Sequence, residues 1–357
     1  MNKRTNLLII GAGPFGLALA VYVKHLGVEH LIVGKPGEFP KSDVPDDMLL
    51  RSASDWPLDP TDRATVDKYL KSMGKTPADV EPLSQDFYLA YCQWFQEQSG
   101  VQCLPFYATK LEQVHGAFEA QLANGEAIEA QQVVIAVSKE YFRDLPLELT
   151  DLLPKGRFKH TGEAVQLKRL KGKRVLILGD RQSAFEWAAL LKDKGAAEVR
   201  LVHRPESPRF AKSELKVKPW LEKRVMKNVT HIHIHAMTKL VSCTERADGA
   251  LDIGLDNGES FIVDEVILAT GYKVDLGQIP FLQEGNLLEK IWVQDGFPVL
   301  DEQLQTTVKG LYIAGSPSTR DPGPFFGSSV SVRTSAKMIG SAIANPQNEP
   351  GSIIYEY

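Results

Sequence analysis

The stretch NLLIIGAGPFGLALAVYV, residues 6–23, decides the fold. It begins as a short apolar run, typical of a buried parallel strand, and ends as the crossover helix that follows such a strand. Between them stands Gly-x-Gly-x-x-Gly: Gly11 permits the tight turn, Gly13 lets a pyrophosphate approach the backbone, and Gly16 lets helix and strand pack closely. The helix N-terminus would present free N–H groups and its positive dipole end to the phosphates. We therefore predict a dinucleotide-binding turn made of Gly11, Ala12, Gly13, Pro14, Phe15 and Gly16.

The end of the second strand departs from the usual pattern of such units. This strand is predicted at residues 30–33, and an acidic residue that binds the ribose hydroxyls usually follows it. Here Gly34 and Lys35 stand in that place. The ribose must therefore find another partner, and we count Lys35 among the candidate cofactor-binding residues.

A second turn, GDRQSA at residues 179–184, repeats the arrangement of the first. It follows a strand predicted at residues 173–178 and precedes a helix predicted at residues 183–194. Arg181 occupies the position of the second glycine. The candidate nucleotide contacts in this turn are Gly179, Arg181, Gln182, Ser183 and Ala184.

Three interpretations of Arg181 are open. Its planar guanidinium can bind phosphate bidentately in place of a backbone contact, or it can point away and leave binding to Ser183 and the helix end. In the third interpretation the site has lost its nucleotide.

Arg204 follows the next strand, predicted at residues 198–203, and Arg209 comes five residues later. Because arginine at this strand end suits a 2′-phosphate, we favour an altered but working NADPH site, with NADH possible.

The chain contains two copies of one plan, with the second inside the first. Each copy has a βαβ unit, an antiparallel insertion and a returning strand; the insertions carry the turn signals Asn124-Gly125 and Asn257-Gly258. The returning strands are predicted at residues 132–137, 264–269 and 310–314, and a closing helix at residues 326–344. The predicted fold class is α/β with two nested Rossmann-like dinucleotide-binding domains and antiparallel β insertions. The predicted domains are residues 1–150 with 275–357, and residues 151–274.

Composition narrows the class of protein. The chain has 357 residues, 43% hydrophobic and 24% charged, with a net charge of −4, so nothing indicates a nucleic-acid partner. No stretch approaches the ~20 apolar residues of a membrane span. Its three cysteines form no C-x-x-C pair, which argues against a dithiol redox centre and favours a reducing, cytoplasmic compartment.

The sequence HIHIH would place His231, His233 and His235 on one face of a strand. Three imidazoles can ligate zinc or copper, but no matching carboxylate or cysteine spacing accompanies them. We therefore predict no metal site.

A further stretch carries a family resemblance. DEVILATGY, residues 264–272, matches the D-x-x-x-L-A-T-G-Y signature of N-hydroxylating monooxygenases. The fingerprint F-x-G-x-x-x-H-x-x-x-aromatic of flavin-containing monooxygenases is matched only in part by PKGRFKHTGEA, residues 154–164, where Gly156 and His160 fit. Over nearly its whole length the chain resembles this group of flavoproteins with two dinucleotide folds.

The resemblance implies cofactors and further contacts. The first domain would hold FAD and the second NAD(P)H. LYIAGSPSTRDPGPFF, residues 311–326, looks like the group's last flavin contact, and residues 48–56 align with the segment that passes the flavin ring. The contacts added in this way are Arg51, Ser52, Thr270, Gly271, Gly315, Gly323 and Pro324.

The same resemblance implies a monooxygenase. A C4a-hydroperoxyflavin would oxygenate a small amine or sulfur nucleophile, with dioxygen and this small molecule as the partners. Relatives often carry an asparagine where Arg51-Ser52 stands, which puts oxygen chemistry in doubt more than flavin binding. The alternatives are a flavin-dependent NAD(P)H reductase that passes electrons to a small acceptor, and a non-catalytic nucleotide-binding protein. The sequence assigns no catalytic residue and no oligomeric state.

Overall fold

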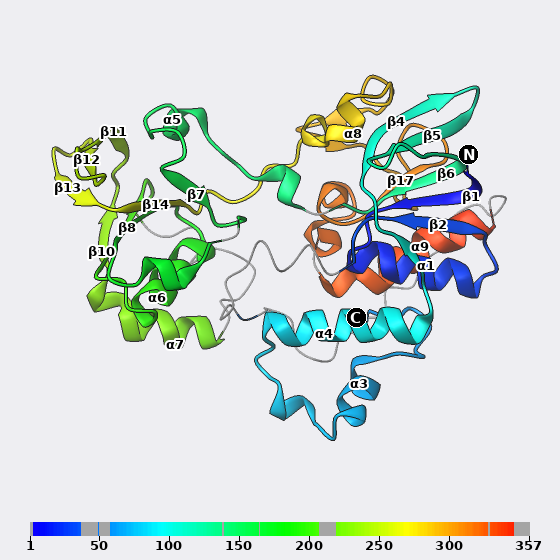
Figure 1. Ribbon diagram of the computed structural model, residues 1–357, viewed down its shortest axis with the longest axis horizontal. Coiled ribbons are helices and arrows are strands. Elements are labelled where there is room, and N and C mark those ends of the chain that lie inside the picture. Colours follow the sequence, from blue (N-terminus) through cyan, green and yellow to red (C-terminus); the bar gives the residue numbers. More distant parts are fainter. Residues whose placement is uncertain are drawn as a thin grey trace. The chain divides into compact units, whose positions relative to one another are not determined.

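The computed structural model describes residues 3–36, 49, 58–137, 139–163, 165–206, 219–327 and 329–345 (Figure 1). Its contacts divide the chain into two compact units. Apart from Leu49, the described residues up to Phe142 and from Val274 onward form unit 1, and Arg143–Lys273 form unit 2. Arg51, Ser52 and Arg209 lie outside the described residues.

Unit 1 is built on a seven-stranded mixed sheet with the order β3-β2-β1-β6-β5-β4, in which β17 also pairs with β6. Strands β1, β2, β3, β6 and β17 run parallel, and β4 and β5 form the antiparallel insertion. The strands are β1 (Lys3–Ile10), β2 (His30–Val33), β3 (Cys103–Leu104), β4 (Ala108–Val114), β5 (Ala117–Leu122), β6 (Ala127–Ile135) and β17 (Leu311–Ile313). The predicted turn at Asn124-Gly125 is confirmed between β5 and β6.

Among the helices of unit 1, α4 (Gln85–Ser99) is capped at both ends. In α4, Ser84 accepts a hydrogen bond from the Phe87 N–H, and Gly100 ends the helix in the left-handed conformation. Helices α1 and α9 lie side by side (Figure 1), because Gly340 has no side chain: a Cβ there would lie 2.5 Å from the Tyr22 ring. The helices are α1 (Pro14–His25), α3 (Val66–Ser72), α4 (Gln85–Ser99), α8 (Pro280–Gln283) and α9 (Val332–Ala344), with a small ribbon of β15 (Val293–Gln294) and β16 (Phe297–Pro298).

The predicted start of the closing helix was wrong. Helix α9 begins at Val332, and the residues before it form short 3₁₀ turns over Pro324–Gly327 and Ser329–Ser331. The Ser331 hydroxyl donates to the Phe326 carbonyl. A side chain therefore uses an acceptor that an α-helix starting at Phe326 would need.

Unit 2 contains a wholly parallel five-stranded sheet with the order β10-β9-β8-β14-β7 and a separate antiparallel sheet, β11-β12-β13. The strands are β7 (Phe158–His160), β8 (Arg174–Leu178), β9 (Glu198–His203), β10 (His233–Ala236), β11 (Leu240–Glu245), β12 (Leu251–Leu255), β13 (Ser260–Val263) and β14 (Glu265–Leu268). The helices are α5 (Leu147–Thr150), α6 (Gln182–Asp193) and α7 (Pro219–Asn228). Two dinucleotide-type folds with antiparallel insertions are thus present, as predicted.

Strand β8 shows why its sequence is continuously apolar. Val175 and Ile177 belong to the core that α6 covers, where Trp187 is buried. The alternate residues Leu176 and Leu178 belong to the core under the antiparallel sheet. Both faces of the strand are therefore buried, which places its carboxyl end, the second glycine turn, at the centre of the sheet's edge.

Candidate functional site

The first glycine turn joins β1 to α1, and its three glycines differ in role. A Cβ on Gly11 would lie 2.2 Å from the Ala136 carbonyl oxygen, and one on Gly16 would lie 1.8 Å from the Gly11 carbonyl oxygen. Gly11 also has φ +122°. A Cβ on Gly13 would meet nothing within 4 Å. The protein itself needs Gly11 and Gly16, whereas Gly13 faces open space, the condition for a pyrophosphate to approach the backbone.

The other end of unit 1 returns to this turn. Gly315 follows β17 with φ +89°, and a Cβ there would lie 3.6 Å from the Phe15 ring. Gly323, φ +99°, has open space at its Cβ position, and Pro324 begins the 3₁₀ turn after it. The structure therefore brings Gly315 against the first turn. The flavin contacts assigned to Gly315, Gly323 and Pro324 stay predictions.

The second glycine turn joins β8 to α6 in unit 2. A Cβ on Gly179 would lie 2.4 Å from the Ala269 carbonyl oxygen, so this glycine also serves close packing. Ala184, in the place of the third glycine, is fully buried. Arg181 is the N-cap of α6 with φ −105° and ψ 175°, an extended conformation that closely matches Gly13 before α1. No glycine is required at this position for backbone reasons.

The Arg181 side chain is exposed. Within the described part of the chain, no hydrogen bond or ion pair holds its guanidinium. It stands at the start of a twelve-residue helix, where the free N–H groups attract anions. An exposed arginine at a helix N-terminus is a combination that favours an anionic ligand.

Arg204 follows the carboxyl end of β9, the neighbour of β8 in the sheet. Its Nη2 donates to Glu148 Oε1 at 3.3 Å, and both side chains are well exposed. An exposed pair of this kind contributes about 0–1 kcal/mol, so a phosphate can replace the carboxylate at little cost.

The carboxyl ends of β14 and β7 form a hydrogen-bonded cluster beside the second turn. Thr270 donates through its hydroxyl to the Asp144 carbonyl, and the Asp144 N–H donates to the Gly271 carbonyl at 3.0 Å. His160, fully buried, accepts from the Gly162 N–H and packs edge-on against Tyr272, with ring centroids 5.4 Å apart. The two motif residues His160 and Tyr272, far apart in the sequence, are therefore in contact.

The cysteines offer no dithiol chemistry. All three are free, and burial raises the pKa of the thiol of Cys92 to about 12 and that of Cys103 to about 11. Burial also raises the pKa of Cys243. Thiols with such pKa values are protonated at neutral pH and are poor nucleophiles.

The histidine run is divided between two elements. His233 and His235 lie in β10, but His231 belongs to a preceding 3₁₀ turn, so the expectation of three histidines on one strand was wrong. His235 donates from Nδ1 to Glu259 at 2.8 Å and accepts at Nε2 from Arg200 at 3.2 Å. Among the described residues, no group of three His, Cys, Asp or Glu side chains is placed to hold a metal ion.

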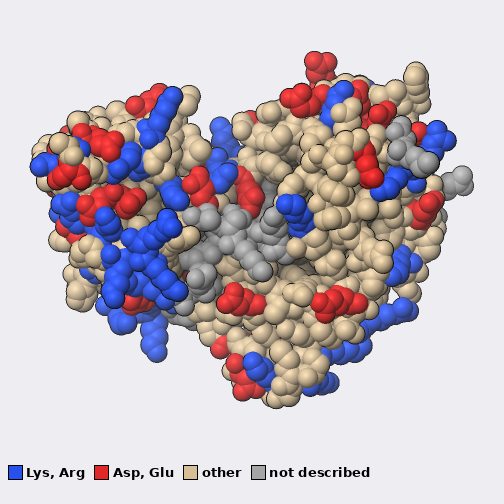
Figure 2. All heavy atoms as spheres, viewed as in Figure 1, with Lys and Arg blue, Asp and Glu red and all other residues tan. Residues whose placement is uncertain are grey.

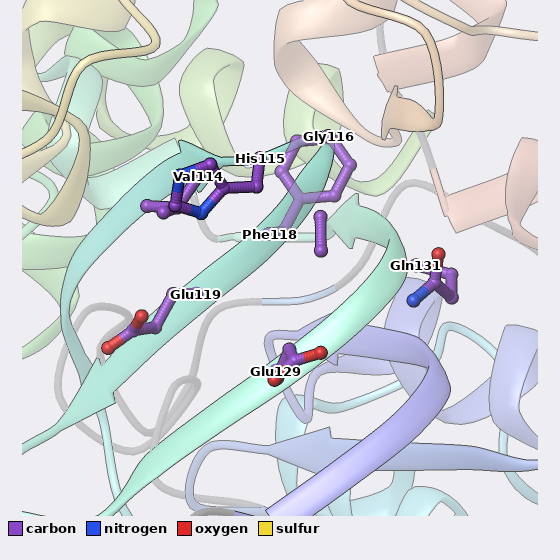
Figure 3. Close-up of a pocket in the computed structure, with 8 residues that line it drawn as sticks. Val114, His115, Gly116, Phe118, Glu119, Glu129 and Gln131 are labelled. Carbon is purple, nitrogen blue, oxygen red and sulfur yellow. The ribbon is translucent and has the colours of Figure 1, made fainter.

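The surface shows two further features. A hollow of about 470 Å³ lies on the antiparallel insertion of unit 1, where Glu119 and Glu129 stand on neighbouring strands (Figure 3). None of the predicted cofactor contacts lines it.

Basic side chains gather on unit 2 (Figure 2), the unit that carries Arg181 and Arg204, and such a surface favours anionic ligands. In the described part of the chain, no helix has the length and apolar character to span a bilayer.

The family model of the pyridine nucleotide-disulphide oxidoreductases matches residues 8–315. The chain belongs to this family. It is therefore an FAD-dependent oxidoreductase that uses a pyridine nucleotide. A ferredoxin–NADP reductase of Salinispora tropica is 27% identical over 318 residues, which cover 87% of this chain and 85% of that protein.

Solved structures of low sequence identity share the fold. Bacillithiol disulfide reductase from Staphylococcus aureus aligns with a TM-score of 0.75 at 20% identity, over 97% of this chain and 100% of that one. Ornithine hydroxylase from Pseudomonas aeruginosa aligns with a TM-score of 0.76 at 17% identity, over 96% and 99%. The resemblance to the flavoprotein monooxygenases is thus confirmed at the level of the fold, which reductases share.

Sequence reasoning missed two features that lie beside the predicted contact residues. Strand β7 is only three residues long and lies at the sheet edge. Tyr107 follows β3, a two-residue strand without a detectable pattern, yet its ring lies beneath the Lys35 ammonium. Only pairing with neighbouring strands reveals either element.

Proposed function

We propose that unit 1 binds FAD at the first glycine turn and that unit 2 binds NADPH at the second. One observation carries this proposal. The N-caps Gly13 and Arg181 have matching backbone conformations, and each follows the carboxyl end of an interior strand, β1 in unit 1 and β8 in unit 2. Gly13 leaves room for a pyrophosphate, and Arg181 supplies a guanidinium instead. FAD, when bound, supplies the transfer of electrons from NADPH.

The chain's own residues bind the two cofactors and orient them. Pro14 at the first helical position has no N–H, so the N–H groups of Phe15 and Gly16 are the ones that would hold the FAD phosphates at the start of α1. Arg181 holds the NADPH pyrophosphate, and Arg204 contacts the 2′-phosphate. Thr270 and Gly271, which follow β14, would contribute to the same NADPH site.

The terminal acceptor is external to the chain in this proposal. The three cysteines form no C-x-x-C pair and their thiols have raised pKa values, so an internal dithiol does not receive the electrons. We propose dioxygen as acceptor and a small amine or sulfur nucleophile as the substrate oxygenated. The support is DEVILATGY at residues 264–272 and the contact of its Tyr272 with His160.

A second function is favoured by a different observation. The ferredoxin–NADP reductase relative at 27% identity covers 87% of the chain. In this alternative, electrons pass from NADPH through FAD to an external one- or two-electron acceptor, and no substrate is oxygenated.

One experiment separates the two functions. The FAD-loaded protein is supplied with NADPH and a panel of amines and thioethers in air, and products are analysed by mass spectrometry with ¹⁸O₂. A monooxygenase incorporates one labelled atom into a product and consumes NADPH in step with it. If NADPH is consumed only with an added electron acceptor and no label enters any product, the reductase is correct.

A further inference from the structure

The end of β2 cannot carry the usual acidic ribose anchor. Gly34 has φ +132°, and a Cβ there would lie 2.9 Å from the Ala12 nitrogen and 3.3 Å from the Ala12 Cβ. Any side chain at this position would meet the first glycine turn itself. The adenosine end of a dinucleotide bound at that turn must therefore be held by other residues.

Lys35 and Tyr107 occupy the same edge of the sheet. The Lys35 Nζ lies 5.3 Å from the centroid of the Tyr107 ring, within the range of a cation–π contact. Tyr107 is fixed by its backbone, since its carbonyl accepts from the Ala123 N–H at 2.9 Å. The residue is nevertheless 47% exposed, so it lies at the protein surface.

Pairing of the strands fixes where this couple lies. Val33 of β2 is in register with Leu104 of β3, so both strands end at one edge. The Gly11 N–H donates to the Val33 carbonyl at 2.9 Å, which ties the first glycine turn to that edge. In a dinucleotide bound at the end of β1, the adenosine extends over the end of β2.

We propose that Tyr107 and Lys35 form the adenosine platform of the FAD site; this inference rests on the proposed binding of FAD to unit 1. The adenine ring stacks on Tyr107, because every base has a π face that an aromatic side chain can cover. The Lys35 ammonium donates to the ribose oxygens, which reverses the usual hydrogen bonding in which a carboxylate accepts from the hydroxyls. The platform replaces the acidic anchor that Gly34 excludes.

The test uses the flavin-free full chain and two probes. FAD binding is measured by calorimetry, and ADP is titrated against bound FAD, so that only ADP at the FAD site is counted. Tyr107→Ala should weaken FAD and ADP by the same factor, about tenfold, the low end of base stacking on an aromatic ring. Tyr107→Phe should bind as wild type, because it keeps the ring. Lys35→Ala should weaken both probes two- to fivefold, and Lys71→Ala, an exposed lysine on α3, is the matched control.

The possible outcomes distinguish failure of the platform from failure of the proposed FAD binding. Wild-type affinity of both probes in Tyr107→Ala and Lys35→Ala overturns the platform while leaving FAD binding intact. Loss of FAD without loss of ADP also overturns it, because the residues would then act on the flavin half. If the wild-type chain binds no FAD at all, the proposed function itself has failed. If Tyr107→Ala does not fold, Lys35→Ala decides by the same criterion.

Discussion

Arg181 offers the sharpest perturbation, because its backbone tolerates any residue. The N-cap of α6 is extended, with φ −105° and ψ 175°, so Arg181→Ala and Arg181→Gly create no strain. The side chain is exposed and caps no N–H group, so stability should change by no more than about 0.5 kcal/mol. A change in nucleotide affinity can then be assigned to lost contacts with the nucleotide and not to a loss of protein stability.

The magnitude follows from one hydrogen-bonded contact between charged groups. Such a contact contributes about 1.5–3 kcal/mol, and Arg181→Ala should therefore weaken NADPH and NADH alike, roughly 10- to 150-fold. Arg181→Gly should recover part of this loss, because it restores the open position that Gly13 has in the first turn. FAD affinity should be unchanged, since its site lies on unit 1.

The assay is calorimetric titration of each variant with NADP⁺ and NAD⁺. If the arginine instead blocks the site, both variants should bind more tightly than wild type, or bind where wild type does not. Unchanged affinity in both variants would refute the reasoning and leave Arg181 without a role in binding.

Three further predictions concern other parts of the chain. Gly13→Asp should abolish FAD binding while the thermal unfolding temperature of the flavin-free protein is unchanged, because the new carboxylate enters open space facing the phosphates; retention of flavin in the purified variant would contradict this. Arg204→Ala should raise the KM for NADPH much more than for NADH, since only NADPH carries the 2′-phosphate, and equal effects in steady-state kinetics would show that Arg204 does not contact it. Burial lowers the pKa of His235. The charge of Arg200 lowers it further, whereas Glu259 raises it, and the net effect is that the folded state favours the neutral imidazole. Stability should therefore fall as the pH drops through about 6.5, where the unfolded chain takes up the proton first, and urea unfolding of His235→Gln should lose that part of the pH dependence.

Long apolar runs made most of the fold predictable. Strands β1, β8 and β14 are buried on both faces, so their sequences are continuously hydrophobic and mark interior strands of the two main sheets. Turn chemistry was equally informative: Asn124-Gly125 and Asn257-Gly258 supply the positive φ values of their hairpins, at Gly125 and Gly258.

The misses have separate physical causes, and none of them leaves a local pattern in the sequence. Strand β7 and residue Tyr107 owe their positions to pairing with strands distant in the sequence, which leaves no periodic pattern in a segment of two or three residues. The start of α9 was misplaced because Ser331 competes for a backbone carbonyl through its side chain. The departure at Gly34 was visible in the sequence, but its reason, the approach of Ala12, was not.

The most direct test of the central claim is anaerobic reduction of the protein-bound flavin by NADPH. The purified chain is loaded with FAD, freed of excess cofactor and mixed with NADPH in a stopped-flow spectrometer, with Gly13→Asp as the control. The account predicts that the wild type retains FAD and that NADPH bleaches its absorbance, while the control retains none. A wild-type chain that stays colourless after incubation with excess FAD, or whose bound flavin NADPH does not reduce, would contradict the account.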